Sequence, residues 1–156
     1  MVTLNVIQKF LEPRKMAIAG ASRNIKKFGG VVFKELHDKG FSLYPINPNA
    51  EEIQGIKCYK SVDELPADVE HLLILTSKEE TNSVVQAAIK KGIKMIWIQQ
   101  KSETTEALKN IKEAEIQLIY NKCIMMFAAP VKGVHEFHRF LSKTFGAYPK
   151  LVFSTN

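Results

Sequence analysis

The chain has 156 residues, of which 46% are hydrophobic and 24% are charged, as in an ordinary globular domain. This composition excludes collagen-like, intrinsically disordered and disulfide-scaffold proteins. Lys and Arg outnumber Asp and Glu by 22 to 16, and the resulting net charge of +6 favours an anionic partner without saying which one.

The first predicted elements alternate between helix and strand. Apolar residues at helical spacing predict a helix over Thr3–Leu11, with Thr3 as its N-cap. A short apolar run predicts a strand over Met16–Ala19, and Phe28–Lys39 again has helical spacing before Gly40. Ser42–Ile46 is the second predicted strand, and the following Asn-Pro-Asn favours a turn.

The same alternation continues through the second half of the chain. Lys57–Tyr59 is a weak strand, and Ser61-Val62-Asp63-Glu64 has the capping-box pattern that opens a helical turn. The apolar run in His71–Thr76 is the strongest strand signal. The remaining expected elements are helices over Glu79–Lys91 and Glu103–Ala114 and strands over Ile93–Ile98 and Gln117–Tyr120.

Continuous apolar strands that alternate with amphipathic helices predict a doubly wound, mainly parallel α/β sheet with helices on both faces. Pro130–Phe145 has the pattern of an extra amphipathic C-terminal helix. We therefore expect a main unit over residues 1–126 and a helical extension over residues 127–156, packed on the same domain. The apolar stripe of that helix fits docking on its own sheet and docking on a second subunit equally well, so a homo-oligomer is an open possibility.

In such a sheet, ligands bind at the carboxyl ends of the strands. The loop after the first strand combines Gly20, Ser22 and the cations Arg23, Lys26 and Lys27, and Gly29-Gly30 at the helix start lets backbone N–H groups approach an anion. No Asp or Glu occurs at the predicted strand ends. This loop predicts a phosphate site, and an ordinary surface loop with solvated lysines is the alternative.

Two departures argue against a dinucleotide cofactor. The next glycines lie nine and ten residues after Gly20, so the loop is not GxGxxG. The end of the second strand carries Asn47-Pro48-Asn49 in place of the acid that holds the ribose of NAD. An oxidoreductase that uses NAD or NADP is therefore the second hypothesis for the function.

The ordered motifs of the chain resemble the CoA-binding domain family, which comprises Rossmann-like proteins similar to the N-terminal domain of the succinyl-CoA synthetase α subunit. The resemblance covers about residues 7–125 and rests on Ala19-Gly20-Ala21-Ser22, Phe28-Gly29, Tyr44-Pro45-Ile46-Asn47-Pro48, Gly55, Tyr59, Trp97-Ile98-Gln99 and Asn121-Lys122-Cys123. It implies that the domain binds coenzyme A (CoA) or an acyl-CoA. The ligase chemistry of the larger enzymes is not implied, because it requires further domains.

The resemblance also implies roles for individual residues. Gly20, Ala21, Ser22 and Arg23 would face the diphosphate, and Lys26 or Lys27 would suit the extra phosphate of CoA. Asn47 and Pro48 would border the adenosine, and Leu75, Thr76 and Ser77 would line the path of the pantetheine arm. The matched motifs add Phe28, Gly29, Gln99 and Cys123 to the expected cofactor-binding residues.

Other constellations carry weaker signals. Cys123, at a strand end beside Lys122, either exchanges with the CoA thiol or is a buried, inert cysteine, and the second interpretation is favoured. His135 and His138 lack HExxH spacing, and no catalytic residue or metal site is predicted. Because the basic residues are spread along the chain without a recognition motif, we expect no nucleic-acid partner.

The expected compartment follows from what the chain lacks. Cys58 and Cys123 lie far apart, which fits a reducing compartment. The N-terminus has no signal-peptide pattern, and no apolar run approaches the roughly 20 residues that cross a bilayer. We therefore expect a cytoplasmic protein without a membrane partner, whose role is to bind or to regulate.

Overall fold

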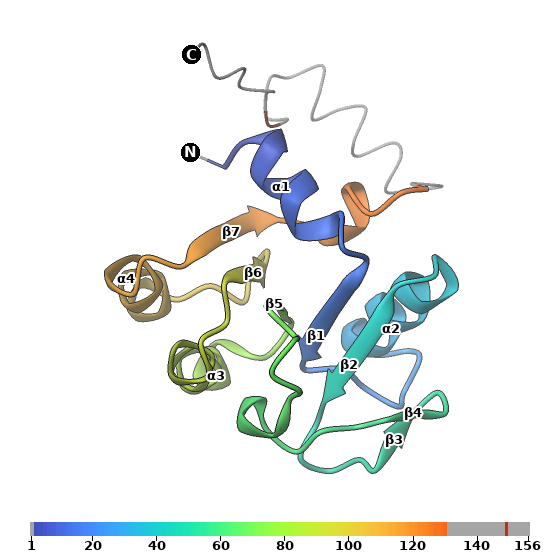
Figure 1. The fold of residues 1–156 in the computed structure, drawn as a ribbon. Coiled ribbons are helices and arrows are strands. Elements are labelled where there is room, and N and C mark those ends of the chain that lie inside the picture. Colours follow the sequence, from blue (N-terminus) through green and yellow to red (C-terminus); the bar gives the residue numbers. More distant parts are fainter. Residues whose placement is uncertain (1, 131–148, 150–156) are drawn as a thin grey trace.

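The computed structural model describes residues 2–130 and Pro149, and a five-stranded parallel sheet lies at its centre (Figure 1). The order of the strands is β2-β1-β5-β6-β7. Because β2 lies on one side of β1 and β5 on the other, the winding direction reverses at β1, where a ligand crevice is expected. The strands are β1 (Lys15–Ala19), β2 (Ser42–Ile46), β5 (His71–Ile74), β6 (Met95–Gln99) and β7 (Gln117–Lys122).

Helices cover both faces of this sheet. Alternate residues of β1 point to opposite sides, so Met16 and Ile18 pack with α1 (Leu4–Leu11) and α2 (Phe28–Asp38). Ala17 and Ala19 belong to a second core with α3 (Lys78–Lys91) and α4 (Thr105–Glu113). The structure therefore confirms the predicted doubly wound, mainly parallel Rossmann-like α/β fold.

The helix ends follow the local signals of the sequence. The Thr3 Oγ1 atom accepts a hydrogen bond from the Val6 N–H group, and Thr104 caps α4 in the same way through the N–H group of Ala107. Gly92 ends α3 with a φ of 82°, a conformation that glycine adopts without strain. All four predicted helices in this part of the chain are confirmed to within about two residues at each end.

The strand expected over His71–Thr76 is confirmed as β5, which ends at Ile74, two residues earlier than predicted. Two other local predictions are wrong. The predicted capping box is not formed: Ser61 makes no side-chain capping bond, and a carboxylate oxygen of Glu64 instead accepts a hydrogen bond from the Lys60 N–H group at 2.9 Å. The weak strand expected over Lys57–Tyr59 is instead β4, which ends at Lys57.

The crossover from β2 to β5 contains no α-helix. A hairpin of β3 (Glu52–Ile53) and β4 (Ile56–Lys57) fills it, followed by the 3-10 turn η1 (Val62–Glu64). The hairpin escaped prediction because its two-residue strands are too short to show an alternating pattern. Tyr59 forms a parallel bridge with Ile46, so the chain between hairpin and η1 runs beside the end of β2.

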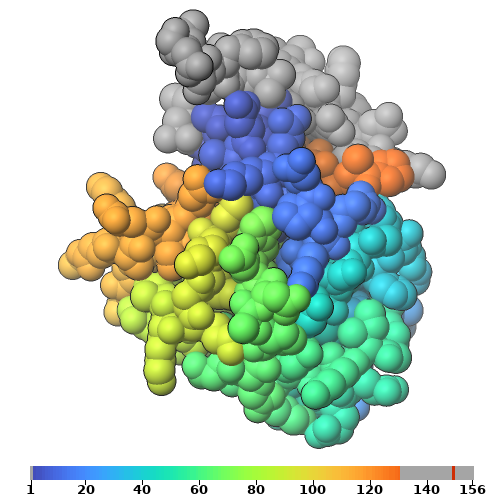
Figure 2. All heavy atoms as spheres, in the orientation of Figure 1, coloured from blue at the N-terminus to red at the C-terminus, as the bar shows by residue number. Residues whose placement is uncertain are grey.

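After β7 the chain forms a short 3-10 turn, η2 (Ile124–Met126), which packs with α1 in one core; in Figure 2 the blue atoms of α1 adjoin the orange atoms of this segment. The helix predicted over Pro130–Phe145, with His135 and His138, lies almost wholly outside the described residues. The predicted extension over residues 127–156 and its role in a homo-oligomer therefore stay predictions. Within the described residues, no helix is both long and apolar enough to cross a membrane.

Candidate functional site

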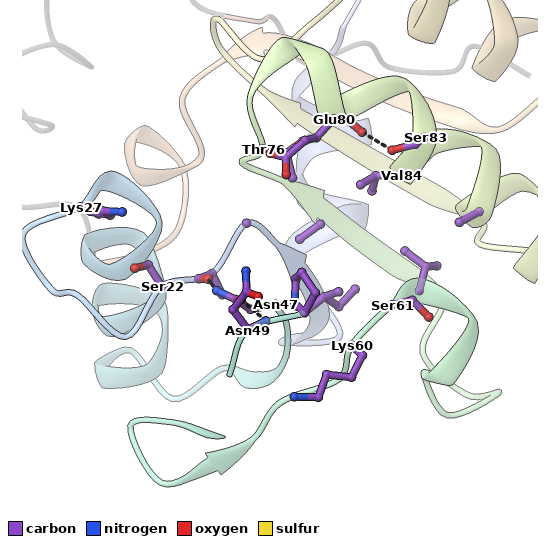
Figure 3. Close-up of a pocket in the computed structure, with 17 residues that line it drawn as sticks. Ser22, Lys27, Asn47, Asn49, Lys60, Ser61, Thr76, Glu80, Ser83 and Val84 are labelled. Atoms are coloured by element: carbon purple, nitrogen blue, oxygen red, sulfur yellow. Dashed lines mark hydrogen bonds between the residues drawn. The ribbon is translucent and has the colours of Figure 1, made fainter. Parts of the chain in front are cut away.

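A pocket of about 460 Å³, here called the first pocket, lies at the carboxyl ends of β1, β2 and β5 (Figure 3). Its volume falls within the range of small-molecule sites. Because β1 and β5 are the strands at which the winding reverses, the position is the one expected for a ligand in an open α/β sheet. The polar and charged side chains that line it are Ser22, Lys27, Asn47, Asn49, Lys60, Ser61, Thr76, Glu80 and Ser83.

Gly20 and Gly29 allow the end of β1 to lie close to the start of α2. Gly20 has a φ of 86°, and a Cβ atom on it would lie 2.9 Å from the Thr76 backbone nitrogen. A Cβ atom on Gly29 would lie 2.0 Å from the Gly20 carbonyl oxygen. The end of β1 and the first turn of α2 can therefore approach each other only because neither residue carries a side chain.

Two side chains of the same loop accept hydrogen bonds from its own backbone. The Asn24 N–H group donates to the Ser22 Oγ atom at 3.1 Å, and the Lys26 N–H group donates to the Asn24 Oδ1 atom at 2.9 Å. The N-cap of α2 is Lys27, which makes no side-chain capping bond. Since the first N–H groups of a helix have no partner within it, the start of α2 is suited to an anion.

Asn47 ties the loops after β1 and β2 together. Its Nδ2 group donates to the Ala21 carbonyl oxygen at 2.9 Å, and its Oδ1 atom accepts from the Asn49 N–H group at 2.8 Å. The exposed Arg23 side chain spans the same gap with a hydrogen bond of 3.4 Å to the Asn49 carbonyl oxygen. These hydrogen bonds brace the two sides of the first pocket against each other.

The two lysines that line the first pocket differ in whether their ammonium groups already have a partner. Within the described residues, the Lys27 ammonium group has no ion-pair or hydrogen-bond partner, and it lies at the rim. The Lys60 ammonium group donates to a Glu51 carboxylate oxygen at 2.7 Å and to the Ala50 carbonyl oxygen at 3.1 Å. This contact holds the pKa of the exposed Glu51 carboxyl below its ordinary value.

The lining residues that sequence reasoning missed include the polar side chains of Lys60, Ser61, Glu80 and Ser83. Lys60 and Ser61 come just after the weak strand predicted at Lys57–Tyr59. The rule that ligands bind at the carboxyl ends of strands could therefore have identified them as well. Glu80 lies in the first turn of α3, where its Oε2 atom accepts a hydrogen bond from the Ser77 hydroxyl at 3.1 Å. It gives the first pocket a carboxylate that the loops themselves lack.

The structure separates the predicted site residues into groups. Arg23 and Lys26 are exposed outside the first pocket, Gly29 is buried behind Gly20, and Leu75 and Ser77 border the pocket without lining it. Those that line it are Gly20, Ala21, Ser22, Lys27, Asn47, Pro48 and Thr76. Phe28, Gln99 and Cys123 line a different pocket.

That second pocket has a volume of about 440 Å³ and lies at the carboxyl ends of β6 and β7. Its other lining residues are Gln100, Lys101, Ser102 and Met126. The start of α2 separates the two pockets, because Lys27 lines the first pocket and Phe28 the second. Cys123 is partly exposed here, so the favoured interpretation of a buried cysteine is wrong. No cluster of three metal-ligating side chains occurs among the residues that the structure describes.

Comparisons with known proteins agree with this geometry. The CoA-binding domain family matches residues 14–129. The alpha subunit of ADP-forming acetate–CoA ligase II from Pyrococcus furiosus is 32% identical over 143 residues, which are 90% of this chain and 31% of that subunit. Two further relatives are ADP-forming acetate–CoA ligases from Methanocaldococcus jannaschii and Archaeoglobus fulgidus, which are 35% identical over 85% and 33% identical over 59% of this chain. The chain spans 31%, 19% and 14% of the length of these three relatives.

Two solved structures are matched over nearly their whole length. A hypothetical protein from Pyrococcus horikoshii has a TM-score of 0.76 and 34% identity, over 85% of this chain and 94% of its own. A conserved hypothetical protein from Pyrococcus furiosus has a TM-score of 0.69 and 38% identity, over 71% of this chain and 96% of its own. With its sheet order, its glycine junction and this match, the chain belongs to the CoA-binding domain family.

Proposed function

We propose that the first pocket binds coenzyme A or an acyl-CoA, and that the protein acts as a binding or regulatory protein. The observation that carries this proposal is a pocket at the point where the winding of the sheet reverses, in a chain of the CoA-binding domain family. Lys27 lines this pocket, and its ammonium group has no ion-pair partner among the described residues. The relatives whose names include CoA ligation are longer, so their reactions are not carried over to this chain.

The phosphate end of the ligand is assigned to the loop after β1. Gly20 and Gly29 allow the close approach of backbone that a diphosphate needs, and the start of α2 offers unpaired N–H groups. Lys27 adds a positive charge at the same rim. Of the two lysines that the resemblance offers for the extra phosphate, only Lys27 lines the pocket, so it is the better candidate.

The nucleoside end is assigned to the loop after β2. Asn47 and Pro48 line this side, and Lys60 and Ser61 add a second polar edge from the crossover. No acid stands at the end of β2, where an NAD-binding site holds its ribose hydroxyl groups. This difference supports a ligand with an added phosphate, such as the 3′-phosphorylated ADP part of CoA, over NAD.

Isothermal titration calorimetry of the whole chain with CoA, dephospho-CoA and NAD tests this proposal. We expect CoA to bind most tightly and dephospho-CoA about tenfold more weakly, because a charge-assisted hydrogen bond to the 3′-phosphate is lost. NAD should bind more weakly than both. No heat with CoA at millimolar concentration, or equal binding of NAD, would overturn the assignment.

A lysine variant tests which end of the first pocket holds phosphate. Lys27→Ala should weaken CoA binding by about tenfold, since it removes one charged donor from the phosphate end. Lys94→Ala is the matched control, because Lys94 is an exposed lysine next to the amino end of β6, at the opposite edge of the sheet. Equal losses in the two variants, measured by the same titration, would show that net charge alone accounts for the binding.

A further inference from the structure

One face of helix α3 forms a wall of the first pocket. Four residues at helical spacing line the pocket from this side: Glu80, Ser83, Val84 and Ala87. Because residues three and four positions apart lie next to one another on a helix, these side chains share one face. Figure 3 shows Glu80, Ser83 and Val84 on one side of the pocket and Lys27 on another. The wall is therefore separate from the glycine loop that is assigned to phosphate.

The apolar part of this wall suits a flat ring. Val84 and Ala87 pack against the same apolar cluster that contains Ile46 of β2 and Val62 of η1, and all four residues line the pocket. A purine base buries its faces against aliphatic side chains of this kind, whereas a phosphate does not. The nucleoside end of the ligand, which is assigned to the loop after β2, therefore extends to α3. This step rests on the proposed function.

The Glu80 carboxylate is a hydrogen-bond acceptor at the polar end of the same wall. Its Oε2 atom accepts a hydrogen bond from the Ser77 hydroxyl at 3.1 Å, and its Oε1 atom has no partner within the described residues. Ser83 does not satisfy it, because the Ser83 hydroxyl donates to the Glu80 backbone carbonyl oxygen at 2.8 Å. Ser77 thus orients the carboxylate and leaves one of its oxygens for a ligand.

The chemistry of a carboxylate restricts which part of the ligand it can meet. An ionised carboxylate only accepts hydrogen bonds, and it repels phosphates. The nucleoside of CoA has two kinds of donor, the ribose hydroxyl and the exocyclic amino group of adenine. The ribose hydroxyl lies beside the 3′-phosphate, where a second negative charge is unfavourable. The amino group lies at the edge of the base, away from the phosphates, and is therefore the donor that suits Glu80.

The spacing along α3 agrees with this choice. Glu80 and Val84 are four residues apart, which is about one helical turn, or about 5.4 Å along the axis. A purine ring system has a similar length. A base that packs on Val84 and Ala87 can therefore present its amino edge to the carboxylate one turn away.

We propose that Glu80 determines which base the first pocket accepts, by taking a hydrogen bond from the exocyclic amino group of adenine. This bond is charge-assisted, because its acceptor is ionised. A base without an N–H group at that position leaves the carboxylate unpaired and binds more weakly. Glu80 is thus a specificity-determining residue, and the pocket selects adenine among ligands that carry the same phosphates.

Isothermal titration calorimetry with CoA and etheno-CoA tests this proposal. In etheno-CoA a fused ring replaces the N–H bonds of the adenine amino group, while the phosphates and the pantetheine arm are unchanged. Wild type should bind CoA at least about tenfold more tightly than etheno-CoA. Glu80→Gln should reduce this preference to about threefold or less, because a neutral amide oxygen is a weaker acceptor. Glutamine has the size of glutamate, so a preference caused by a clash with the fused ring would not change.

Glu79→Gln is the matched control. Glu79 precedes Glu80 in the first turn of α3 and is also exposed, but it does not line the first pocket. Both variants remove one negative charge, which strengthens the binding of every phosphorylated ligand and cancels in the ratio of the two affinities. Glu79→Gln should therefore keep the wild-type preference. An equal fall of the preference in both variants, or a wild-type preference below about threefold, would overturn the inference.

Dephospho-CoA separates contact with the base from contact with the ribose. Glu80→Gln should leave the preference for CoA over dephospho-CoA as it is in wild type, because the proposed contact is with the base. A change of that preference without a change of the preference over etheno-CoA would place the carboxylate at the ribose and overturn the inference.

The failure of this inference and the failure of the proposed function give different results. If wild type binds CoA and Glu80→Gln has the same preference over etheno-CoA as wild type, Glu80 has no role in base selection and the proposed function stands. No heat with CoA or with etheno-CoA would remove the proposed function and this inference together.

Discussion

Replacing Gly29 by alanine should both destabilise the protein and abolish CoA binding in the first pocket. A Cβ atom at this position would lie 2.0 Å from the Gly20 carbonyl oxygen, which belongs to backbone and cannot rotate away. Overpacking of this kind costs about 1–3 kcal/mol, and we expect the upper end because two backbone segments must separate. Thermal denaturation followed by circular dichroism, together with CoA titration, measures the two effects.

The direction of the stability change in Gly29→Ala tests the close contact between Gly29 and Gly20. Glycine within a helix is normally about 0.5–1 kcal/mol worse than alanine, so helix propensity alone predicts that Gly29→Ala stabilises the protein. A higher melting temperature with intact CoA binding would therefore contradict the close contact. Val31→Ala is the control, because Val31 is 39% exposed on the same helix and its truncation should stay within about 0.5 kcal/mol.

Trp97→Ala should be the most destabilising single change in the described part of the chain. The Trp97 side chain has no exposed surface, and its ring centroid lies 5.5 Å from that of Phe10 and 5.9 Å from that of Phe127. Truncation of a buried tryptophan leaves a large cavity and costs about 3–5 kcal/mol, a large share of the stability of an ordinary domain. Urea unfolding followed by circular dichroism gives this value.

The Trp97 indole also connects the core to the second pocket. Its Nε1 group donates to the Lys122 carbonyl oxygen at 3.0 Å, one residue before Cys123. Trp97→Phe keeps most of the packing but loses this bond, so it should lower the free energy of unfolding by about 1–3 kcal/mol in the same urea experiment. If Trp97→Ala cost less than about 1 kcal/mol, the ring would not be the central packing element that the geometry describes.

The sheet could be predicted because its strands are buried on both faces. Two of the strands contain continuous apolar runs, Leu72-Leu73-Ile74 and Ile96-Trp97-Ile98, and each run is followed by an amphipathic helix. The alternation of strand and helix is therefore visible in the sequence itself. The β3–β4 hairpin has no such signal. Its turn depends on positive φ values at Gln54 and Gly55, of 51° and 75°, and a glutamine in that conformation has no sequence signature.

The first pocket could be predicted only in part, for a related reason. The loops after β1 and β2 follow strong strands, so the rule that ligands bind at strand ends predicts Ser22 and Asn47. Lys60 follows the bridge of Tyr59 to Ile46, which is too weak for a pattern to indicate. Glu80 reaches the first pocket from α3, and only the packing of that helix on the sheet brings its carboxylate there.

The packing of α1 has a consequence for any transfer of this domain into another protein. The family match begins at residue 14, yet Phe10 and Ile7 are almost fully buried, and Phe10 stacks on His71, whose Nδ1 group donates to the Phe10 carbonyl oxygen at 2.9 Å. A fragment cut at the start of the match would leave His71 and Trp97 without their cover. The stretch that defines the family by sequence is therefore shorter than the piece that folds, and a chimera designed on it must carry α1 as well.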